Sequence, residues 1–371
     1  MTKIAVFTSS RADYGLLSKL IDKLNNEIGI DVHFIVTGTH LSQKHGMTVQ
    51  EIIEDGFQIY ARIEVTMEED DPVDLTNAVA DLQRQIAIEL KALSPDAMII
   101  LGDRFEALPA AYAAALQRIK IVHLHGGEIT LGAIDNKIRF AISHLADFHL
   151  TATERSKQRL ISGGIDEKYV VNTGAIGVEN AMKVVKYSRA EIESKTGFRF
   201  RKNNILFTFH PETISKLSAR QQINTVLDGL AYFQEAAKFI SLPNADPGNQ
   251  IISQCLENFS NSCSNIYFAK NFGHRLYLSL MGEVDVVVGN SSSGIIEAPA
   301  LGVATVDIGD RQKGREKASS VVECGYDQMN IKRAIQKAIS SKKSPPLTKH
   351  PYYQDDTCNL MVSSIKEFLS H

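Results

Sequence analysis

The sequence lacks several features that would assign it to common classes of protein. Its 371 residues include only four cysteines, spaced neither as C-x-x-C nor as a zinc finger, so reduced thiols in a cytosol are expected. The longest apolar stretch, residues 107–116, is far shorter than the ~20 residues that a membrane span needs. The formal net charge of −3 offers no basic surface for nucleic acid or acidic membranes. A first strand expected from Lys3 onward leaves no room for a signal peptide. Together these features predict a soluble, cytoplasmic protein with no nucleic-acid or membrane partner.

Two common phosphate-binding motifs are also missing. Residues 8–15, T-S-S-R-A-D-Y-G, follow the first expected strand but lack the G-x-G-x-x-G fingerprint of dinucleotide-binding proteins. Residues 309–314 have the glycine spacing of a P-loop, but Arg315-Glu316 follows where that motif requires Lys-Ser or Lys-Thr. The sequence therefore predicts neither of these two types of nucleotide site.

Strand and helix signals alternate along most of the chain, which is typical of βαβ units and of parallel sheets covered on both faces. The expected strands are residues 3–9, 32–37, 58–63, 97–101, 121–124, 148–151, 169–172, 204–209, 239–242, 265–269, 286–288 and 303–308. Residues 174–200 interrupt this rhythm, and we interpret their polar stretch as an interdomain connection. Because a single core rarely grows past ~250–300 residues, the length also favours two domains. We therefore expect an α/β protein with two doubly wound, Rossmann-like domains, residues 1–178 and 179–356, facing each other across a cleft.

Residues 285–315 carry the strongest binding signal. The strand ends at Gly289-Asn290, and a short helix carrying Glu297 begins after a small-residue turn made of Ser291, Ser292, Ser293 and Gly294. Such a turn presents backbone N–H groups and the positive end of a helix dipole to an anion. Glu297 suits a pair of sugar hydroxyls, and the guanidinium groups of Arg311 and Arg315 could reach a diphosphate. For the serines alone, an ordinary capped helix start is an equal alternative.

Polar residues also end two expected strands of the first half. Asp103 and Arg104 follow four apolar residues, at the edge of the sheet where ligands of parallel sheets bind. His123 and His125 of the H-L-H-G-G-E segment share one face of the next strand. With Glu128 they could suggest zinc, but the third ligand lies on a Gly-Gly loop and no H-E-x-x-H helix exists. We therefore predict no metal and assign His125 and Glu128 to acid–base chemistry.

Three other polar residues are ambiguous on their own. Arg11 could face a phosphate, although Ser10 also suits a helix N-cap followed by a solvated arginine. Asp135 and Arg139 are spaced i, i+4 at a helix start, which fits either a site or a plain stabilising pair.

In the second half, two further strand ends and one aromatic residue are candidates. His210 ends a strand in F-H-P-E and is expected to point into the cleft, and Asn244 lies in a turn at another strand end. Phe272 could lie against a planar base, and a place in the core is an equal alternative.

Taken together, these segments resemble the sialic-acid branch of the UDP-N-acetylglucosamine 2-epimerase family, the hydrolysing enzymes. S-R-A-D-Y-G, T-G-T-H, G-D-R, H-G-G-E, A-I-D-N-K-I-R, F-H-P-E-T, G-N-S-S-S-G-I-I-E and G-D-R-Q-K-G-R occur in that order across residues 8–315. The resemblance implies a glycosyltransferase-B-like fold whose last helix, residues 357–371, returns to the first domain. It also implies a UDP-sugar substrate, UDP as product, no cofactor, and a homodimer or homotetramer.

The resemblance further implies roles for individual residues. UDP would be bound by Arg11, His210, Asn244, Ser291, Ser292, Glu297 and Arg311. The sugar would be surrounded by Asp103, Arg104, Asp135 and Arg139, with His40 of T-G-T-H nearby. Relatives often have Glu where this chain has His125, and Lys where it has Leu16. Both departures resemble the capsule and nonulosonic-acid subgroup, and they leave open whether His125 or Glu128 replaces the family's catalytic Glu.

The implied reaction converts UDP-N-acetylglucosamine and water into N-acetylmannosamine and UDP through a 2-acetamidoglucal. The C2 proton becomes acidic only after loss of UDP gives C1 oxocarbenium character, so the diphosphate and the sugar cation both need electrostatic stabilisation. We expect the catalytic groups to be Asp103, Glu128, Asp135, His125 and His210. The alternative substrate is UDP-N,N′-diacetylbacillosamine, which would be processed in the same way in the synthesis of legionaminic acid. Alternatives of another class are a glycosyltransferase that uses a UDP-sugar and a non-catalytic nucleotide-sugar binder.

Overall fold

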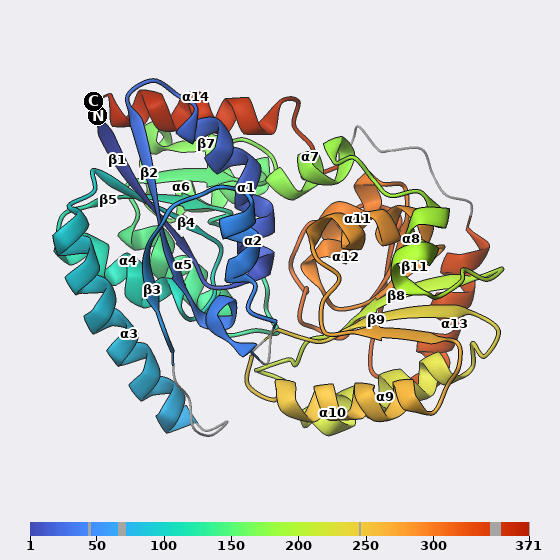
Figure 1. The fold of residues 1–371 in the computed structure, drawn as a ribbon. Helices are drawn as coiled ribbons and strands as arrows, with labels where there is room; N and C mark the ends of the chain where they lie inside the picture. Colours follow the sequence, from blue (N-terminus) through green and yellow to red (C-terminus); the bar gives the residue numbers. More distant parts are fainter. Residues whose placement is uncertain (44–45, 66–71, 245, 342–349, 371) are drawn as a thin grey trace. The chain divides into compact units, whose positions relative to one another are not determined.

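The computed structural model describes residues 1–43, 46–65, 72–244, 246–341 and 350–370 (Figure 1). The chain forms two compact units, and each is built around its own parallel sheet. The first unit comprises Met1–Glu128, Asp135–Glu179 and Gln354–His371, and the second comprises Ile129–Ile134 and Asn180–Tyr353. The expected fold class, α/β with two doubly wound Rossmann-like domains, is confirmed.

The first unit contains a seven-stranded sheet in the order β3-β2-β1-β4-β5-β6-β7. The strands are β1 Thr2–Thr8, β2 Ile30–Thr37, β3 Ile59–Ile63, β4 Ala97–Leu101, β5 Lys120–Leu124, β6 Phe148–Thr151 and β7 Val170–Asn172. The helices are α1 Arg11–Asn25, α2 Val49–Glu54, α3 Pro72–Leu93, α4 Ala107–Leu116, α5 Asp135–Leu145, α6 Glu154–Ser162 and α14 Thr357–Leu369, with 3-10 turns at Gly38–Leu41 and Glu167–Tyr169. Helix α7, Ile176–Lys183, contains the boundary between the two units.

Two hydrophobic clusters cover the two faces of this sheet. On one face, α1, α2 and α14 pack Leu17, Ile52 and Met361 against Ile4 and Val6 of β1. On the other face, α3, α4 and α5 pack side chains such as Ile86 and Ala110 against alternate residues of the same strands. The C-terminal helix α14 therefore belongs to the core of the first unit, beside α1 (Figure 1).

The second unit contains a six-stranded sheet in the order β10-β9-β8-β11-β12-β13. The strands are β8 Asn204–Thr208, β9 Ala237–Ser241, β10 Ile266–Ala269, β11 Val286–Gly289, β12 Ala304–Ile308 and β13 Val321–Cys324. The helices are α8 Arg189–Thr196, α9 Ala219–Ala231, α10 Asn249–Asn261, α11 His274–Glu283, α12 Ser292–Ala300 and α13 Gln328–Ser340. Clusters around α9, α10 and α13 and around α8, α11 and α12 cover its two faces.

Three elements differ from the sequence-based expectation. The interrupted stretch 174–200 contains two helices, α7 and α8, that were not predicted. The second of these begins with a capping box in which Ser188 and Glu191 satisfy each other's backbone N–H groups. The edge strand β13 was also missed, because none of its four residues is fully buried and they show no clear alternation.

The strand orders locate the places where ligands bind in such sheets. In each unit the chain reverses its direction of winding between two central strands, β1 and β4 in the first unit and β8 and β11 in the second. Open parallel sheets bind ligands outside the carboxyl ends of the strands at this switch point. Among the described residues, no helix combines the length and apolar character that crossing a membrane requires.

Candidate functional site

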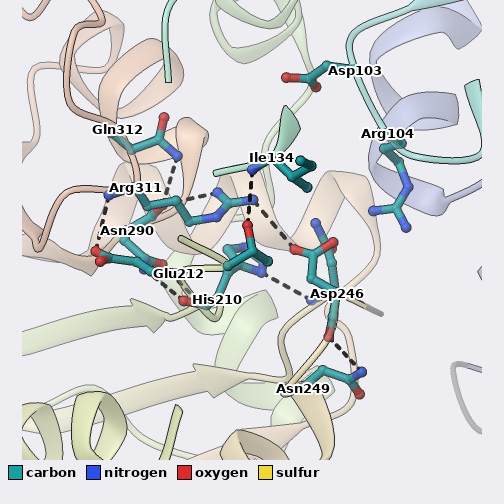
Figure 2. Close-up of polar contacts among 12 residues, drawn as sticks. Asp103, Arg104, Ile134, His210, Glu212, Asp246, Asn249, Asn290, Arg311 and Gln312 are labelled. Atoms are coloured by element: carbon teal, nitrogen blue, oxygen red, sulfur yellow. Dashed lines mark hydrogen bonds and ion pairs between the residues drawn. The ribbon is translucent and has the colours of Figure 1, made fainter. Parts of the chain in front are cut away.

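At the switch point of the second sheet, the side chain of Asn290 holds His210 in place (Figure 2). The backbone N–H of His210 donates to Asn290 Oδ1 at 2.7 Å, and Asn290 Nδ2 donates to the His210 carbonyl at 2.8 Å. The backbone N–H of Asn244 donates to His210 Nδ1 at 3.1 Å. A neutral His210 ring that accepts at Nδ1 carries its proton on Nε2, so Nε2 is the ring nitrogen that acts as a donor.

Close packing of β8 against β11 requires a glycine at this point. Gly289 has φ +135°, and a Cβ built there would lie 1.9 Å from the carbonyl oxygen of Thr208. No side chain fits in that space, so only glycine allows the two strand ends to meet and Asn290 to reach His210.

The loop after β12 brings Arg311 to the same place. Arg311 Nη1 and Gln312 Nε2 donate to the backbone carbonyl of Asn290 at 3.3 and 2.8 Å. Arg311 Nη2 lies 3.6 Å from Asp246 Oδ2, and the arginine side chain is 12% exposed. The guanidinium of Arg311 is thus oriented by groups from two other loops, those after β9 and β11 (Figure 2).

Glu212 fixes the backbone of this loop, although the sequence analysis did not select it. Its Oε1 accepts from the N–H groups of Asp310 at 2.6 Å and Arg311 at 3.1 Å. Its own N–H donates to Gln222 Oε1 at 3.0 Å, and burial raises the pKa of its carboxyl group. The signal available in the sequence was its place two residues after His210, in the same F-H-P-E-T segment.

The serine turn forms the N-terminus of α12, as expected. In the described structure Ser291 is the N-cap, but its hydroxyl caps no amide of this helix and instead lies 3.0 Å from the Ser293 hydroxyl. The Ser293 hydroxyl also lies 2.6 Å from the Tyr277 hydroxyl, and Ser291, Ser292 and Ser293 are all partly exposed. Gly294 is buried, and its carbonyl accepts from Thr305 Oγ1 at 2.6 Å. The backbone N–H groups and the dipole of a helix N-terminus favour an anion, so the predicted role of this turn stays a prediction.

Three other residues selected in this unit differ in burial. Glu297 is 7% exposed on α12, and Arg315 is partly exposed three residues after Gln312. Phe272 is 6% exposed, and its ring stacks on Tyr267 and Tyr277 within the hydrophobic cluster that α8, α11 and α12 form. Of the two places that the sequence allowed for Phe272, against a planar base or in the core, this packing corresponds to the core.

In the first unit, Arg139 joins Asp103 to the loop after β5. Arg139 is 1% exposed, its Nη2 forms an ion pair with Asp103, and its Nη1 donates to the Glu128 carbonyl at 2.8 Å. Asp103 follows β4 and keeps 19% of its side chain exposed. A buried guanidinium thus fixes a partly exposed carboxylate at the switch-point side of the sheet. Asp135 is the first residue of the helix that carries Arg139.

His125 occupies an unusual backbone conformation beside Glu128. Its φ of +63° lies in the left-handed region, which is strained for a residue with a side chain and occurs often at functional sites. Its Nδ1 lies 3.2 Å from Glu128 Oε1, and both side chains are almost fully buried. The two residues that the sequence offered as alternative acid–base groups therefore form one pair.

His123 lies on β5, but the strand ends at Leu124, so His125 does not share a strand face with it as the sequence predicted; His123 instead contacts the surroundings of the Asp103–Arg139 pair. It is fully buried, its Nε2 donates to the Gly102 carbonyl at 2.7 Å, and its Nδ1 accepts from the Ser143 hydroxyl at 3.2 Å. Gly102 precedes Asp103, and Ser143 lies one helical turn after Arg139. The imidazole therefore links the backbone of one partner to the helix of the other.

Three other selected residues lie at the ends of β1, β2 and β4. Arg104 donates to Ser9 Oγ at 3.1 Å and to the buried carboxylate of Glu106 at 2.9 and 3.2 Å. His40 is buried between the hydroxyls of Thr8 and Thr48, each at 2.9 Å, and burial lowers its pKa to about 4. Arg11 begins α1, directly after the N-cap Ser10, and is partly exposed.

Buried neutral histidines make the stability of the first unit dependent on pH. Burial lowers the pKa of His123 from 6.5 to about 4, so between these values the unfolded chain binds a proton that the folded chain does not. Stability then rises with pH in this window and falls on acidification. Glutamine at position 123 cannot titrate. Since one proton changes the free energy of unfolding by about 1.4 kcal/mol per pH unit, we expect the free energy of unfolding of His123→Gln to fall by roughly 2 kcal/mol less than that of the wild type between pH 7 and pH 5. Urea unfolding at both pH values measures this, and equal losses in the two proteins would contradict it.

Comparisons with known proteins give a consistent result. A family model described as UDP-N-acetylglucosamine 2-epimerase matches residues 22–366. A polysialic acid biosynthesis protein, P7, of Escherichia coli is 33% identical over 383 residues, which cover 100% of this chain and 95% of the relative. A GDP/UDP-N,N′-diacetylbacillosamine 2-epimerase (hydrolysing) of Campylobacter jejuni is 33% identical over 331 residues, which cover 88% and 85%. The crystal structure of a UDP-GlcNAc 2-epimerase from Neisseria meningitidis has a TM-score of 0.79 at 17% identity, and covers 99% of this chain and 100% of that one.

Proposed function

This chain belongs to the UDP-N-acetylglucosamine 2-epimerase family, and on that premise we propose that it is a hydrolysing UDP-sugar 2-epimerase. The enzyme releases UDP from a UDP-linked 2-acetamido sugar and liberates the C2 epimer of that sugar. The observation that carries the proposal is the set formed by Asp103, Arg139 and the His125–Glu128 pair. This set places two separate acid–base groups on the loops after neighbouring strands, as removal and return of a C2 proton require.

The second unit supplies the nucleotide side of the reaction. The N-terminal turn of α12 and the guanidinium of Arg311 bind the diphosphate, because helix N-termini and arginine forks both stabilise phosphate oxygens. Glu297 accepts the ribose hydroxyls. His210, oriented through Nδ1, donates from Nε2 to the departing diphosphate.

The first unit supplies the sugar chemistry. Departure of UDP breaks the bond from C1 to the diphosphate oxygen and leaves positive charge at C1 and the ring oxygen. Asp103 or the His125–Glu128 pair then removes the C2 proton, which gives a 2-acetamidoglucal. Water adds at C1, and the second acid–base group delivers a proton to C2 from the opposite face, which gives the epimer. Asp135 stabilises the sugar cation electrostatically.

Two UDP-sugars are candidate substrates for this site. The family description favours UDP-N-acetylglucosamine, with N-acetylmannosamine as product. The relative from Campylobacter jejuni favours UDP-N,N′-diacetylbacillosamine, which carries a 4-acetamido and a 6-methyl group. The proton transfers at C2 are the same for both sugars, so the substrate is decided by the pocket around C4 and C6.

Incubation with each UDP-sugar in deuterated water tests the activity and identifies the substrate. We expect UDP to appear without any added acceptor, and the free 2-epimer to carry deuterium at C2 in its NMR spectrum. UDP release that needs an acceptor would indicate a glycosyltransferase instead. Saturable binding of both UDP-sugars without UDP release would indicate a nucleotide-sugar binder.

We further propose that the enzyme works in the cytoplasm as a homodimer or homotetramer. The proposal rests on the resemblance to hydrolysing relatives, and light scattering of the purified protein measures the assembly. A monomeric mass at micromolar concentration would contradict it.

A further inference from the structure

The chain passes from the first unit into the second after Glu128 and returns to the first unit at Asp135. Ile129–Ile134 connect Glu128, after β5, to Asp135, the first residue of α5, yet by their contacts they belong to the second unit. We call Ile129–Ile134 the docked segment. Its two neighbours in sequence, Glu128 and Asp135, are both residues to which we have assigned roles in the reaction.

The docked segment is held by backbone hydrogen bonds at two points. The N–H of Leu131 donates to the carbonyl of Lys313 at 3.0 Å, which ties the segment to the loop that carries Arg311. The N–H of Ile134 donates to Thr213 Oγ1 at 3.0 Å, and Ile134 is drawn with this bond in Figure 2. Thr213 directly follows Glu212, the residue that fixes the backbone of the Arg311 loop.

Between these two bonds, the backbones of the segment and of the Arg311 loop touch. A Cβ built on Gly132 would lie 2.4 Å from the Asp310 carbonyl oxygen and 2.7 Å from the Arg311 backbone nitrogen. Those atoms are backbone and cannot rotate away, so the contact exists only because residue 132 has no side chain.

The ends of the docked segment transmit its position to the first unit. On one side, Arg139 donates to the carbonyl of Glu128 and Arg159 donates to the carbonyl of Gly127. These bonds restrain the backbone at Gly127 and Glu128, so a displacement of the docked segment strains this backbone. On the other side, Thr213 holds the peptide group that joins Ala133 to Ile134, one residue before Asp135. Because peptide groups are planar and stiff, only the two backbone dihedrals of Ile134 separate this group from the peptide group of Asp135, so the hydrogen bond constrains where α5 begins.

We propose that Thr213 and Gly132 are positioning residues for the reaction, which act through the docked segment on Asp135 and Glu128. The inference rests on the proposed function. By this arrangement, the loop that binds the diphosphate and the carboxylates that act on the sugar share one short covalent connection. Neither Thr213 nor Gly132 is among the residues to which we assign proton transfer.

The test compares Thr213→Val, which removes the acceptor for the Ile134 N–H, with Thr213→Ser, which keeps a hydroxyl. We expect Thr213→Val to lower kcat roughly fivefold, as the loss of one hydrogen bond does, with the Kd for UDP changed less than twofold. Hydrogen exchange of the Ile134 amide should accelerate in Thr213→Val, and both properties should return in Thr213→Ser.

Gly132→Ala tests the backbone contact, with Gly325→Ala as its control because a Cβ at Gly325 meets nothing within 4 Å. We expect Gly132→Ala to lower kcat on the order of 10²-fold, which is the effect of misplacing a catalytic group by about 1 Å. It should also abolish any UDP-induced slowing of exchange at the Leu131 amide. Gly325→Ala should match the wild type in both measurements.

The outcomes separate this inference from the proposed function. If the wild type releases no UDP from either sugar nucleotide, the proposed function fails. If the wild type is active and both Thr213→Val and Gly132→Ala turn over at its rate, the positioning role is overturned. A lower kcat in Thr213→Val with unchanged Ile134 exchange, or with no recovery in Thr213→Ser, also overturns it.

Discussion

Asp103→Asn should bind UDP with wild-type affinity and turn over at least 10²-fold more slowly. General acid–base groups contribute about 10²–10⁴-fold to a rate, and an asparagine of the same shape can neither remove nor return a proton. Arg139 would lose its ionic partner, but its second donor still holds the Glu128 carbonyl, so the loop after β5 keeps one of its supports. Isothermal titration with UDP and a UDP-release assay measure the two quantities separately.

Asp96→Asn provides the matched control for this substitution. Asp96 directly precedes the same strand, β4, at its opposite end, where its exposed carboxylate accepts from the Lys3 N–H at 2.8 Å. The control makes the same change in net charge without touching the site, and we expect near-wild-type turnover. Turnover of Asp103→Asn within tenfold of the control would remove Asp103 from the mechanism.

The alternation of strand and helix signals was sufficient to predict the fold. Both sheets are parallel and buried on both faces, so their strands are short apolar runs such as Val286–Gly289 that stand out from the amphipathic helices. Strand β13 lies at the edge of its sheet and is only partly buried, so it lacks that contrast. The helices α7 and α8 lie in a polar stretch, where the hydrophobic pattern is weak and the capping box at Ser188 was the better signal.

Part of the candidate site could be predicted from its place after a strand. Asp103 and His210 were selected because strand ends are ligand positions in such sheets. Asn290 and Glu212 were not selected, because their importance depends on partners 80 and 98 residues away. Spacing within a segment carries no information about such contacts. For the same reason, sequence alone could not show that Ile129–Ile134 group with the second unit.

Glu212→Ala should weaken UDP binding about tenfold or more. The substitution leaves the N–H groups of Asp310 and Arg311 without their acceptor, at a cost of about 1–3 kcal/mol for each group that stays dry. The loop would then hold the Arg311 guanidinium less firmly, and part of the binding free energy of UDP would be spent on ordering it. Titration of the variant with UDP measures the Kd, and thermal unfolding shows whether the second unit remains folded.

A competing electrostatic effect decides the choice of control. Removing a negative charge near a diphosphate site favours an anion, which opposes the loss of loop order. Glu212→Gln removes the same charge but keeps an oxygen that can accept from Asp310 and Arg311, so it isolates the charge effect. We expect Glu212→Gln to bind UDP as tightly as the wild type or more tightly, while Glu212→Ala binds it more weakly. If both variants bound UDP more tightly, the charge of Glu212 would determine the affinity for UDP, and its hydrogen bonds to Asp310 and Arg311 would not contribute.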